Sequence, residues 1–433
     1  MSDVLIYALG VVVFLIGVAV SIALHEVGHM WPAKRFGVKV TQYFVGFGRT
    51  LWSVKRGETE YGIKAIPLGG YVKLVGMLPP ARGADPHELR KADTGLLSQL
   101  VADARHAEYE HVTDADQDRL FYKKSWWQKL IVMSGGPMTN VAISAVLFTV
   151  LIAGFGVEEP TTTVKAVADC AISDAEAGRT CTDADPITPA RKIGLQPGDR
   201  IVTFNGRAVE SWPALTAAIR ANGDKVATLE IERDGQRFEQ SVATTVVARA
   251  SLEDPKKTQK VGFLGVEPTF ATVRHGLPTV GTVMWGYTKA TADVIAHLPQ
   301  RMVDVAKAAV GAPRKSDGPI SVVGASRVAG ELVTIDDPTW RERSVRIIAL
   351  LASLNLFLAL FNFIPLLPLD GGHIAGALWE AARRGWAKVR GRPDPGYVDV
   401  ARMLPVAYGV GALLLVMGLL LIYADIVNPV RLS

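Results

Sequence analysis

The 433-residue chain lacks the features that mark several common classes of protein. It has no basic arm and no nucleic-acid recognition motif, and its net charge of +5 is thinly spread, so nucleic acid is not an expected partner. No internal repeat and no phosphate-binding loop is evident. The chain has only two cysteines, Cys170 and Cys181. They have no CxxC spacing and no nearby histidine, which makes them poor zinc ligands.

Apolar residues, in contrast, are abundant, at 49% of the chain with a positive mean hydropathy. A helix needs about 20 residues to cross a bilayer. Four uncharged stretches reach that length: Val4–Leu24, Leu130–Val157, Ile347–Leu369 and Met403–Ala424. The first has no Lys or Arg before it and no small-residue cleavage site, so we expect a retained span rather than a secretory signal. The sequence therefore predicts a polytopic α-helical membrane protein with four transmembrane helices.

Basic residues near the ends of these stretches predict the orientation of the chain. Lys and Arg follow the first stretch, precede the second and lie between the third and fourth: Lys34, Arg35, Lys39, Lys123, Lys124, Lys129, Arg383, Arg384, Lys388, Arg390 and Arg392. We expect the protein to lie in the plasma membrane, with those segments on its cytoplasmic side. Both termini and the section from Glu158 to Arg346 would then be extracytoplasmic.

The motif H-E-x-x-H follows the first apolar stretch directly, at residues 25–29. Positions i and i+4 of a helix share a face, so His25 and His29 can bind one zinc ion while Glu26 reaches the bound water as a general base. Ionisable groups at membrane depth cost about 3 kcal/mol or more unless they are paired or line a wet cavity. A metal site explains them better than the alternative, polar residues that cap the helix among lipid headgroups.

A catalytic zinc site takes three protein ligands and a water, so one ligand must come from elsewhere. The acids that adjoin apolar stretches are few: Glu158, Glu159, Asp370 and Asp425. Only Asp370 is expected on the same side as the histidines. It follows Pro365 and Pro368, which break the helix, and broken backbone at this depth is tolerated only within protein or at a watery cavity. We expect one Zn²⁺ per chain.

The stretch Tyr43–Met77 shows the alternation of paired strands, with "KRGE" as the turn. Gly46 and Gly48 leave room for close backbone approach. Such a membrane-associated β-hairpin can offer an edge to an unwound substrate, and the alternative is an ordinary cytoplasmic hairpin. The charged segment Pro79–Asp118 is expected to be a solvated insert.

Between the second and third spans, residues 160–268 predict an inserted α+β domain. Its expected elements are strand 200–204, the Asn205-Gly206 turn, helix 212–221 begun by Ser211, strand 226–233, the Asp234-Gly235 turn and a last strand in "FLGV" at 263–266. The pattern resembles a PDZ domain, which binds extended peptides at a sheet edge. The domain would dock or size-select trimmed substrates, or serve as a passive lid. An oxidising compartment permits a Cys170–Cys181 disulfide here.

Three motifs together resemble the site-2 protease family of intramembrane zinc metalloproteases, most closely its bacterial branch with a PDZ domain. They are HEVGH at the first span, GGPMTN (Gly135–Asn140) in the second and NFIPLLPLDGGH (Asn362–His373) at the third. The resemblance implies that His25, His29 and Asp370 bind zinc and that Glu26 is the base. It also implies that Asn362, Asn140, Gly46 and Gly48 lie near substrate or intermediate, although Asn362 could instead make a polar contact within the helix bundle.

The function implied is hydrolysis of a peptide bond within the transmembrane segment of a single-pass membrane protein, in regulated intramembrane proteolysis. Substrates would be anti-sigma-factor-like proteins or signal-peptide remnants that an upstream site-1 protease has already cut outside. The alternative is a zinc transporter or PDZ scaffold without proteolysis. Glu26 favours the protease, because a transporter needs ligands but no base beside them.

The expected organisation along the chain is as follows: 1–34, first span with HExxH; 35–128, cytoplasmic β region and charged insert; 129–157, second span; 160–268, PDZ-like domain; 269–346, extracytoplasmic amphipathic helices; 347–373, third span with the LDG motif; 374–402, cytoplasmic basic loop; 403–426, fourth span.

Overall fold

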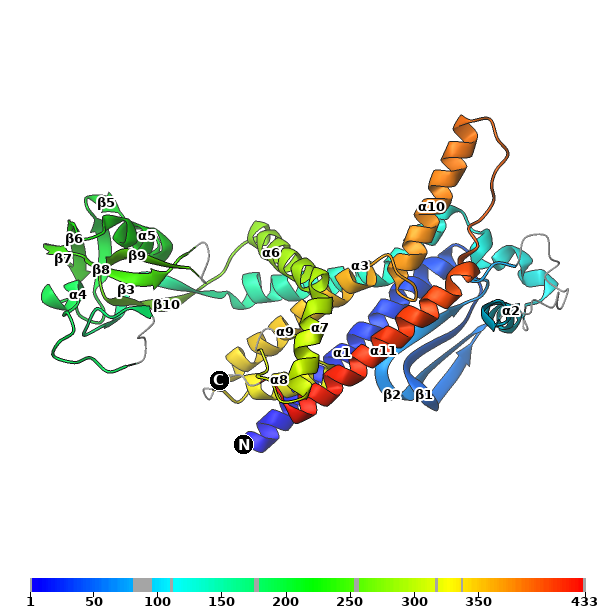
Figure 1. Cartoon of the computed structure of the whole chain (residues 1–433), viewed down its shortest axis with the longest axis horizontal. Coiled ribbons are helices and arrows are strands. Elements are labelled where there is room, and N and C mark those ends of the chain that lie inside the picture. The colour runs from blue at the N-terminus through cyan, green and yellow to red at the C-terminus, as the bar shows by residue number, and fades with distance from the viewer. Residues whose placement is uncertain are drawn as a thin grey trace. The chain divides into compact units, whose positions relative to one another are not determined.

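The computed structural model describes residues 2–80, 96–109, 112–174, 179–252, 257–315, 318–335 and 338–430. They form two compact units (Figure 1). The helical unit comprises Met1–Phe155 and Gly276–Ser433, and the β-rich unit comprises Gly156–His275. The helical unit is thus built from two parts of the chain that the β-rich unit separates in sequence.

Four helices in the described residues are long and apolar enough to cross a membrane, as the sequence predicts. They are α1 (Asp3–Arg35), α3 (Trp126–Thr149, continued by the π-helical turn Val150–Phe155), α9 (Trp340–Asn362) and α11 (Leu404–Val427, preceded by the 3₁₀ turn Val400–Met403). Helix α1 continues eleven residues beyond the apolar stretch that ends at Leu24. The H-E-x-x-H motif therefore lies inside the helix, and Lys34 and Arg35 meet the negative end of its dipole.

The third span is shorter than the prediction of 347–373. Helix α9 stops at Asn362, and residues 363–369, which include two prolines, are not helical. Proline cannot donate the amide hydrogen that a continuing helix requires. The broken backbone expected before Asp370 is confirmed, and Asp370 begins a separate helix, α10 (Asp370–Val389).

The prediction of a basic loop at 374–402 is wrong for its first half, because residues up to Val389 belong to α10. The segment is rich in Ala, Leu, Glu, Arg and Lys, which are all strong helix formers. Basic charge identifies the side of the membrane but does not distinguish a loop from a helix. Only the stretch between Val389 and Val400 connects α10 to the last span without a helix.

Three shorter helices follow the β-rich unit: α6 (Leu277–Ala296), α7 (Leu298–Ala309) and α8 (Val322–Leu332). They lie in the region expected to be helical, 269–346, whose first residues belong to strand β10 and whose last residues belong to α9. Helix α8 packs against α1 and α9 through the cluster Ile6, Phe14, Ala329, Val333 and Ile347. Helix α6 packs against α3 and α9 through the cluster Phe148, Leu151, Ile152, Val280, Ala352 and Leu356.

Strands β1 (Val40–Arg56) and β2 (Thr59–Leu74) pair as an antiparallel hairpin with its turn at Gly57. The register shifts repeatedly around Gly46 and Gly48, which adopt φ angles of 93° and 82°. The base of the hairpin packs on α1 and α3 through the cluster Ala33, Val38, Val40, Leu74, Phe121, Val132 and Met133. The hairpin is thereby fixed to the helix that carries the H-E-x-x-H motif.

Polar contacts also hold the hairpin base. The Lys39 ammonium donates to Asp116 at 2.7 Å, in the 3₁₀ helix Asp114–Arg119, and this bond with those from Thr113 holds the pKa of Asp116 at about 2. Helix α2 (Leu96–Tyr109) follows the hairpin, and its Glu108 accepts the amide of Gly76 at 2.6 Å. Of the predicted solvated insert, residues 81–95, 110 and 111 lie outside the described residues. A last 3₁₀ turn, Phe121–Lys123, leads to α3.

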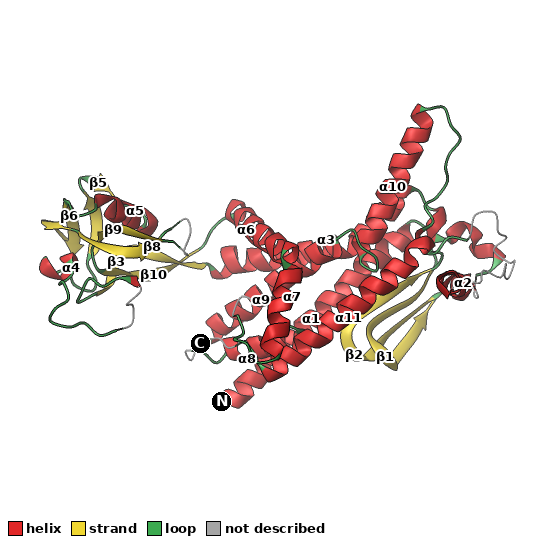
Figure 2. Ribbon diagram, viewed as in Figure 1, coloured by secondary structure: helices red, strands yellow, loops and turns green. Residues whose placement is uncertain are grey.

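The β-rich unit contains a sheet with the strand order β10-β3-β4-β6-β7, with β5 paired to β4, and a separate β8-β9 pair (Figure 2). The strands are β3 (Val157–Val167), β4 (Arg200–Phe204), β5 (Arg207–Ala208), β6 (Val226–Arg233), β7 (Gln236–Ala243), β8 (Thr245–Ala250), β9 (Thr258–Phe263) and β10 (Val266–Val273). The helices are α4 (Pro189–Lys192) and α5 (Trp212–Asn222). A disulfide joins Cys170 to Cys181.

The local sequence signals of this unit are confirmed. Ser211 caps α5, and both Asn205-Gly206 and Asp234-Gly235 form turns with positive φ angles, which these residues tolerate. The expected strand at 263–266 is wrong, because Phe263 ends β9 and Val266 begins β10. Gly265, with a φ of 90°, turns the chain between them.

Candidate metal centre

Two of the predicted ligands face one another from successive turns of α1. His25 and His29 are four residues apart, and their Nε2 atoms lie 3.2 Å from each other. His29 is buried and His25 is partly buried. The helix alone produces this pairing, since side chains at i and i+4 project from one face.

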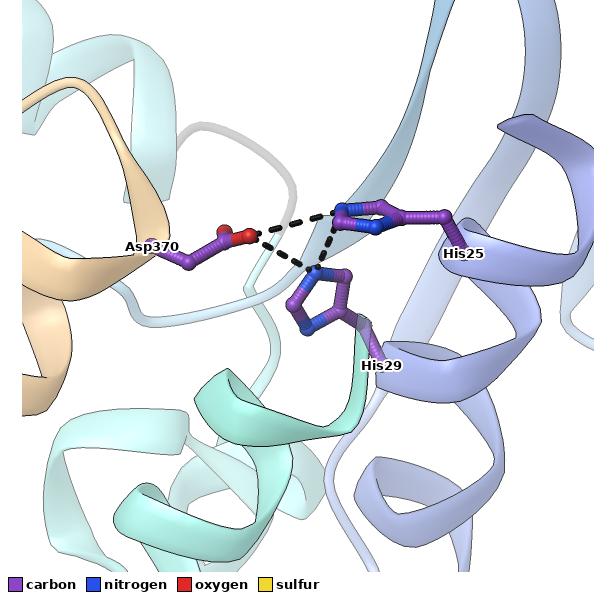
Figure 3. Close-up of side chains that lie close together, drawn as sticks. All are labelled: His25, His29 and Asp370. Atoms are coloured by element: carbon purple, nitrogen blue, oxygen red, sulfur yellow. Dashed lines mark hydrogen bonds and ion pairs between the residues drawn. The ribbon is translucent and has the colours of Figure 1, made fainter. Parts of the chain in front are cut away.

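Asp370 joins the two histidines from a distant part of the chain (Figure 3). Its Oδ2 atom lies 3.4 Å from the Nε2 of His25 and 3.3 Å from the Nε2 of His29. As the first residue of α10, its carboxylate also meets the positive end of that helix dipole. These three residues form the group of potential metal ligands found among the described residues.

The triangle of ligand atoms fits a zinc ion. Tetrahedral zinc binds nitrogen and carboxylate oxygen at about 2.0–2.2 Å, which places neighbouring ligand atoms about 3.3 Å apart. The three sides of the triangle measure 3.2, 3.3 and 3.4 Å. Two imidazoles and one carboxylate are also the donor set of a catalytic zinc site that keeps a position for water.

Helix α3 leaves space beside the ligand nitrogens. A Cβ atom built on Gly136 would lie 2.2 Å from the Nε2 of His29 and 2.6 Å from that of His25. At the preceding residue of each helix, Gly28 and Gly135 touch: a Cβ on Gly135 would lie 1.9 Å from the carbonyl oxygen of Gly28. The absence of side chains at these positions lets α1 and α3 meet and keeps the metal position free. The role of these glycines does not follow from the resemblance of GGPMTN to a family motif, although two adjacent glycines inside an apolar span are a sequence signal for close helix contact.

The second nitrogen of His29 is held by the same helix. Its Nδ1 lies 2.8 Å from the carbonyl oxygen of Val132, so a proton on Nδ1 donates to that oxygen and leaves Nε2 free for a metal. Such outer contacts orient a ligand and raise its basicity.

Glu26 lies next to the histidines and faces the hairpin. A Cβ atom on Gly70 of β2 would lie 2.9 Å from the Cγ of Glu26, and the amide of Val72 lies within hydrogen-bonding reach of its carboxyl group. Tyr43 of β1 donates to the carbonyl oxygen of Ala23 at 2.8 Å. Both strands therefore contact α1 at the level of the motif.

The other predicted site residues lie on neighbouring elements. Asn362 is the last residue of α9 and is half-buried. Asn140 is buried in α3, and its Oδ1 has no hydrogen-bond partner among the described residues. Gly46 approaches β2 so closely that a Cβ would lie 2.7 Å from the carbonyl oxygen of Ile66. Gly48 has more room, with the side chain of Ile66 at 3.5 Å. The two cysteines belong to the β-rich unit, where they form a disulfide with each other.

Comparison with known proteins agrees with this geometry. The model of peptidase family M50 matches residues 13–400. The zinc metalloprotease Rip1 of Mycobacterium tuberculosis is 34% identical over 99% of this chain and 100% of its own length. Rip1 of Mycolicibacterium smegmatis is 33% identical over 98% and 99%, and the metalloprotease MmpA of Caulobacter vibrioides is 25% identical over 84% and 85%.

The molecule is a zinc-dependent metalloprotease with several membrane-spanning helices. The chain belongs to peptidase family M50, the site-2 protease family.

Proposed function

We propose that this enzyme cleaves the transmembrane segment of single-pass membrane proteins, with His25, His29 and Asp370 as the zinc ligands and Glu26 as the general base. The observation that supports this most strongly is the ligand triangle, with sides of 3.2 to 3.4 Å, formed by two residues of α1 and the first residue of α10. Membership of peptidase family M50, together with four helices able to span a membrane, supports proteolysis within the membrane.

The chemistry follows from the neighbours of the triangle. Bound zinc supplies an activated water and polarises the scissile carbonyl. The Glu26 carboxylate accepts a proton from that water and returns it to the leaving amine. Helix α1 places Glu26 one residue from His25, so base and ligand keep a fixed relation.

The hairpin supports the capture of an extended substrate. A peptide bond inside a helix is shielded, and an unwound segment in lipid must find new partners for its backbone. Strands β1 and β2 contact α1 beside Glu26, so a substrate paired along the hairpin would bring its backbone to the base. Asn362, Asn140, Gly46 and Gly48 are assigned to substrate or intermediate contacts in this proposal.

The β-rich unit is proposed to be an extracytoplasmic PDZ-like domain that selects substrates already cut by an upstream site-1 protease. Its support is the antiparallel sheet with α5 and the edge strand β10, whose neighbour in the sheet is β3. Both termini would lie on that same side, and the metal centre toward the cytoplasm. Anti-sigma-factor-like proteins and signal-peptide remnants are the proposed substrates.

The test compares membrane fragments from cells that carry the wild-type protein or Glu26→Gln. We expect the variant to keep its zinc, because Glu26 is not a ligand, and to accumulate uncut single-pass proteins. The outcome that rejects the proposal is unchanged cleavage by Glu26→Gln protein. His25→Ala serves as the companion variant, in which zinc and cleavage are lost together.

A further inference from the structure

A buried ion pair joins the two helices that flank the metal centre. Lys129 of α3 and Glu380 of α10 are 7% and 2% exposed, and the Nζ of Lys129 donates to Oε2 of Glu380 at 2.7 Å. Neither residue belongs to the ligand triangle. The pair nevertheless links the helix that carries Gly136 to the helix that begins with Asp370.

Such a pair is costly as a means of packing two helices. Removing each charge from water costs several kcal/mol, and apolar residues of similar volume often stabilise such a contact equally well. What an ion pair adds is direction, because its hydrogen bonds fix the relative position of the two partners. The pair therefore accounts for the orientation of α10 better than for the stability of its packing.

Helix α10 depends on this kind of constraint. Residues 363–369 separate it from α9 without a helix, so no continuous helix sets its direction. Glu380 lies ten residues, about 15 Å, along α10 from Asp370. The Glu380 carboxylate also contacts Arg384 at 3.0 Å and the amide of Val398 at 3.4 Å. Arg384 lies on α10 itself, but rotation of α10 about its axis would break the contacts with Lys129 and Val398 and swing Asp370 away from the histidines.

We propose that Lys129 and Glu380 are positioning residues for the metal centre, which hold α10 in the rotation that places the Asp370 carboxylate within reach of zinc. The inference rests on the proposed role of Asp370 as a ligand. It predicts that loss of the pair weakens zinc binding by the folded protein in addition to lowering its stability.

The chain offers a matched control at another buried ion pair of the helical unit. Arg314 and Asp425 have side chains that are 4% and 1% exposed, and they meet at 2.9 Å. Asp425 lies in α11 and also accepts the amide of Ser321 at the start of α8. Breaking this pair leaves an equally buried charge without touching α3 or α10.

The experiment measures zinc affinity by competition with a chelator, using the full-length protein. We expect Lys129→Met to weaken zinc binding by about tenfold, because a displaced Asp370 carboxylate costs at least as much as the loss of a contact that orients a ligand. Arg314→Met should stay within about twofold of the wild type, although both variants melt at a lower temperature. The visible spectrum of the cobalt-substituted protein should change in Lys129→Met alone, because it reports ligand geometry.

Equal zinc affinity and equal cobalt spectra in wild-type and Lys129→Met protein would overturn the inference. If Lys129→Met does not fold, Glu380→Asp keeps the charge but shortens the side chain, and unchanged zinc affinity in that variant overturns the inference as well. Asp370→Asn tests the ligand assignment separately. Wild-type affinity in Asp370→Asn would reject the proposed site itself, whereas lost affinity there with unchanged Lys129→Met rejects only the positioning role.

Discussion

Both units bury polar side chains, but in different settings. The core of the β-rich unit is almost wholly aliphatic, with Ile201, Leu215, Leu229 and Ile231 inaccessible to solvent. Its buried polar residues form hydrogen bonds at helix ends and turns: Thr188, Asp199, Asn222 and Thr244. The helical unit buries polar and charged groups where its helices meet: His29, Lys129, Asn140, Ser144, Asn355, Glu380 and Asp425. Apolar helices gain little by leaving lipid for one another, so close backbone contacts and polar pairs must specify their arrangement. Burial of apolar surface stabilises the β-rich unit, whereas specific polar and backbone contacts determine how the helices of the helical unit are arranged.

The largest effect should come from adding one methyl group to the helical unit. In Gly136→Ala the new Cβ would lie 2.2 Å from a ligand nitrogen, so the histidines or α3 must move. We expect zinc affinity to fall by about 100-fold, at the upper end of effects seen near metal ligands. Isothermal titration with zinc measures it. Gly418→Ala in α11 is the control, because no other element of the described chain lies within 4 Å of that added atom. A similar loss of zinc affinity in both variants would contradict positional control.

Truncation of a large side chain in the core of the β-rich unit should leave zinc affinity unchanged. Leu229→Ala removes a fully buried side chain, and we expect the free energy of unfolding of this unit to fall by about 3 kcal/mol. Hydrogen exchange of β4 and β6 should accelerate, while zinc affinity stays the same. Val226→Ala, in the same strand but 66% exposed, should change exchange little. Weaker zinc binding in Leu229→Ala would show that the two units are energetically coupled.

The smallest effect should come from a helix cap. The Ser211 hydroxyl accepts the amide of Ala214 at the start of α5, and Ser211→Ala should cost about 1 kcal/mol. Thermal melting of the β-rich unit within the full-length protein provides the measurement. Ser211→Asp should restore the cap, because aspartate accepts the same bond; equal melting of wild-type, Ala and Asp variants would mean that the cap contributes nothing.

The same contrast explains what the sequence could predict. Strand 226–233 and the turns at Asn205-Gly206 and Asp234-Gly235 occur where predicted, because each depends on adjacent residues. The four spans can be predicted equally well, since length and composition define them. Helix α10 is not predicted, because basic charge alone does not distinguish a helix from a loop. The role of Gly136 is not predicted either, because only its contacts with α1 reveal it.

The proximity of Asp370 to the histidines lies between these cases. Few acids adjoin the spans, and the side of the membrane left one candidate, so the pairing could be anticipated. The distances of 3.3 and 3.4 Å could not, because they depend on how α10 docks after a break in the backbone. The sequence therefore identifies the candidate ligands, but the distances between their ligand atoms depend on the packing of the helices.

The contact between Gly28 and Gly135 bears on how a substrate enters. Where two helices touch main chain to main chain, a change in their separation moves both backbones, and here it would carry His25 and His29 away from Gly136. The seam between α1 and α3 is thus a rigid part of the helical unit. We expect an opening that admits a substrate to involve elements outside this seam, such as the hairpin or α10, which follows the break at residues 363–369.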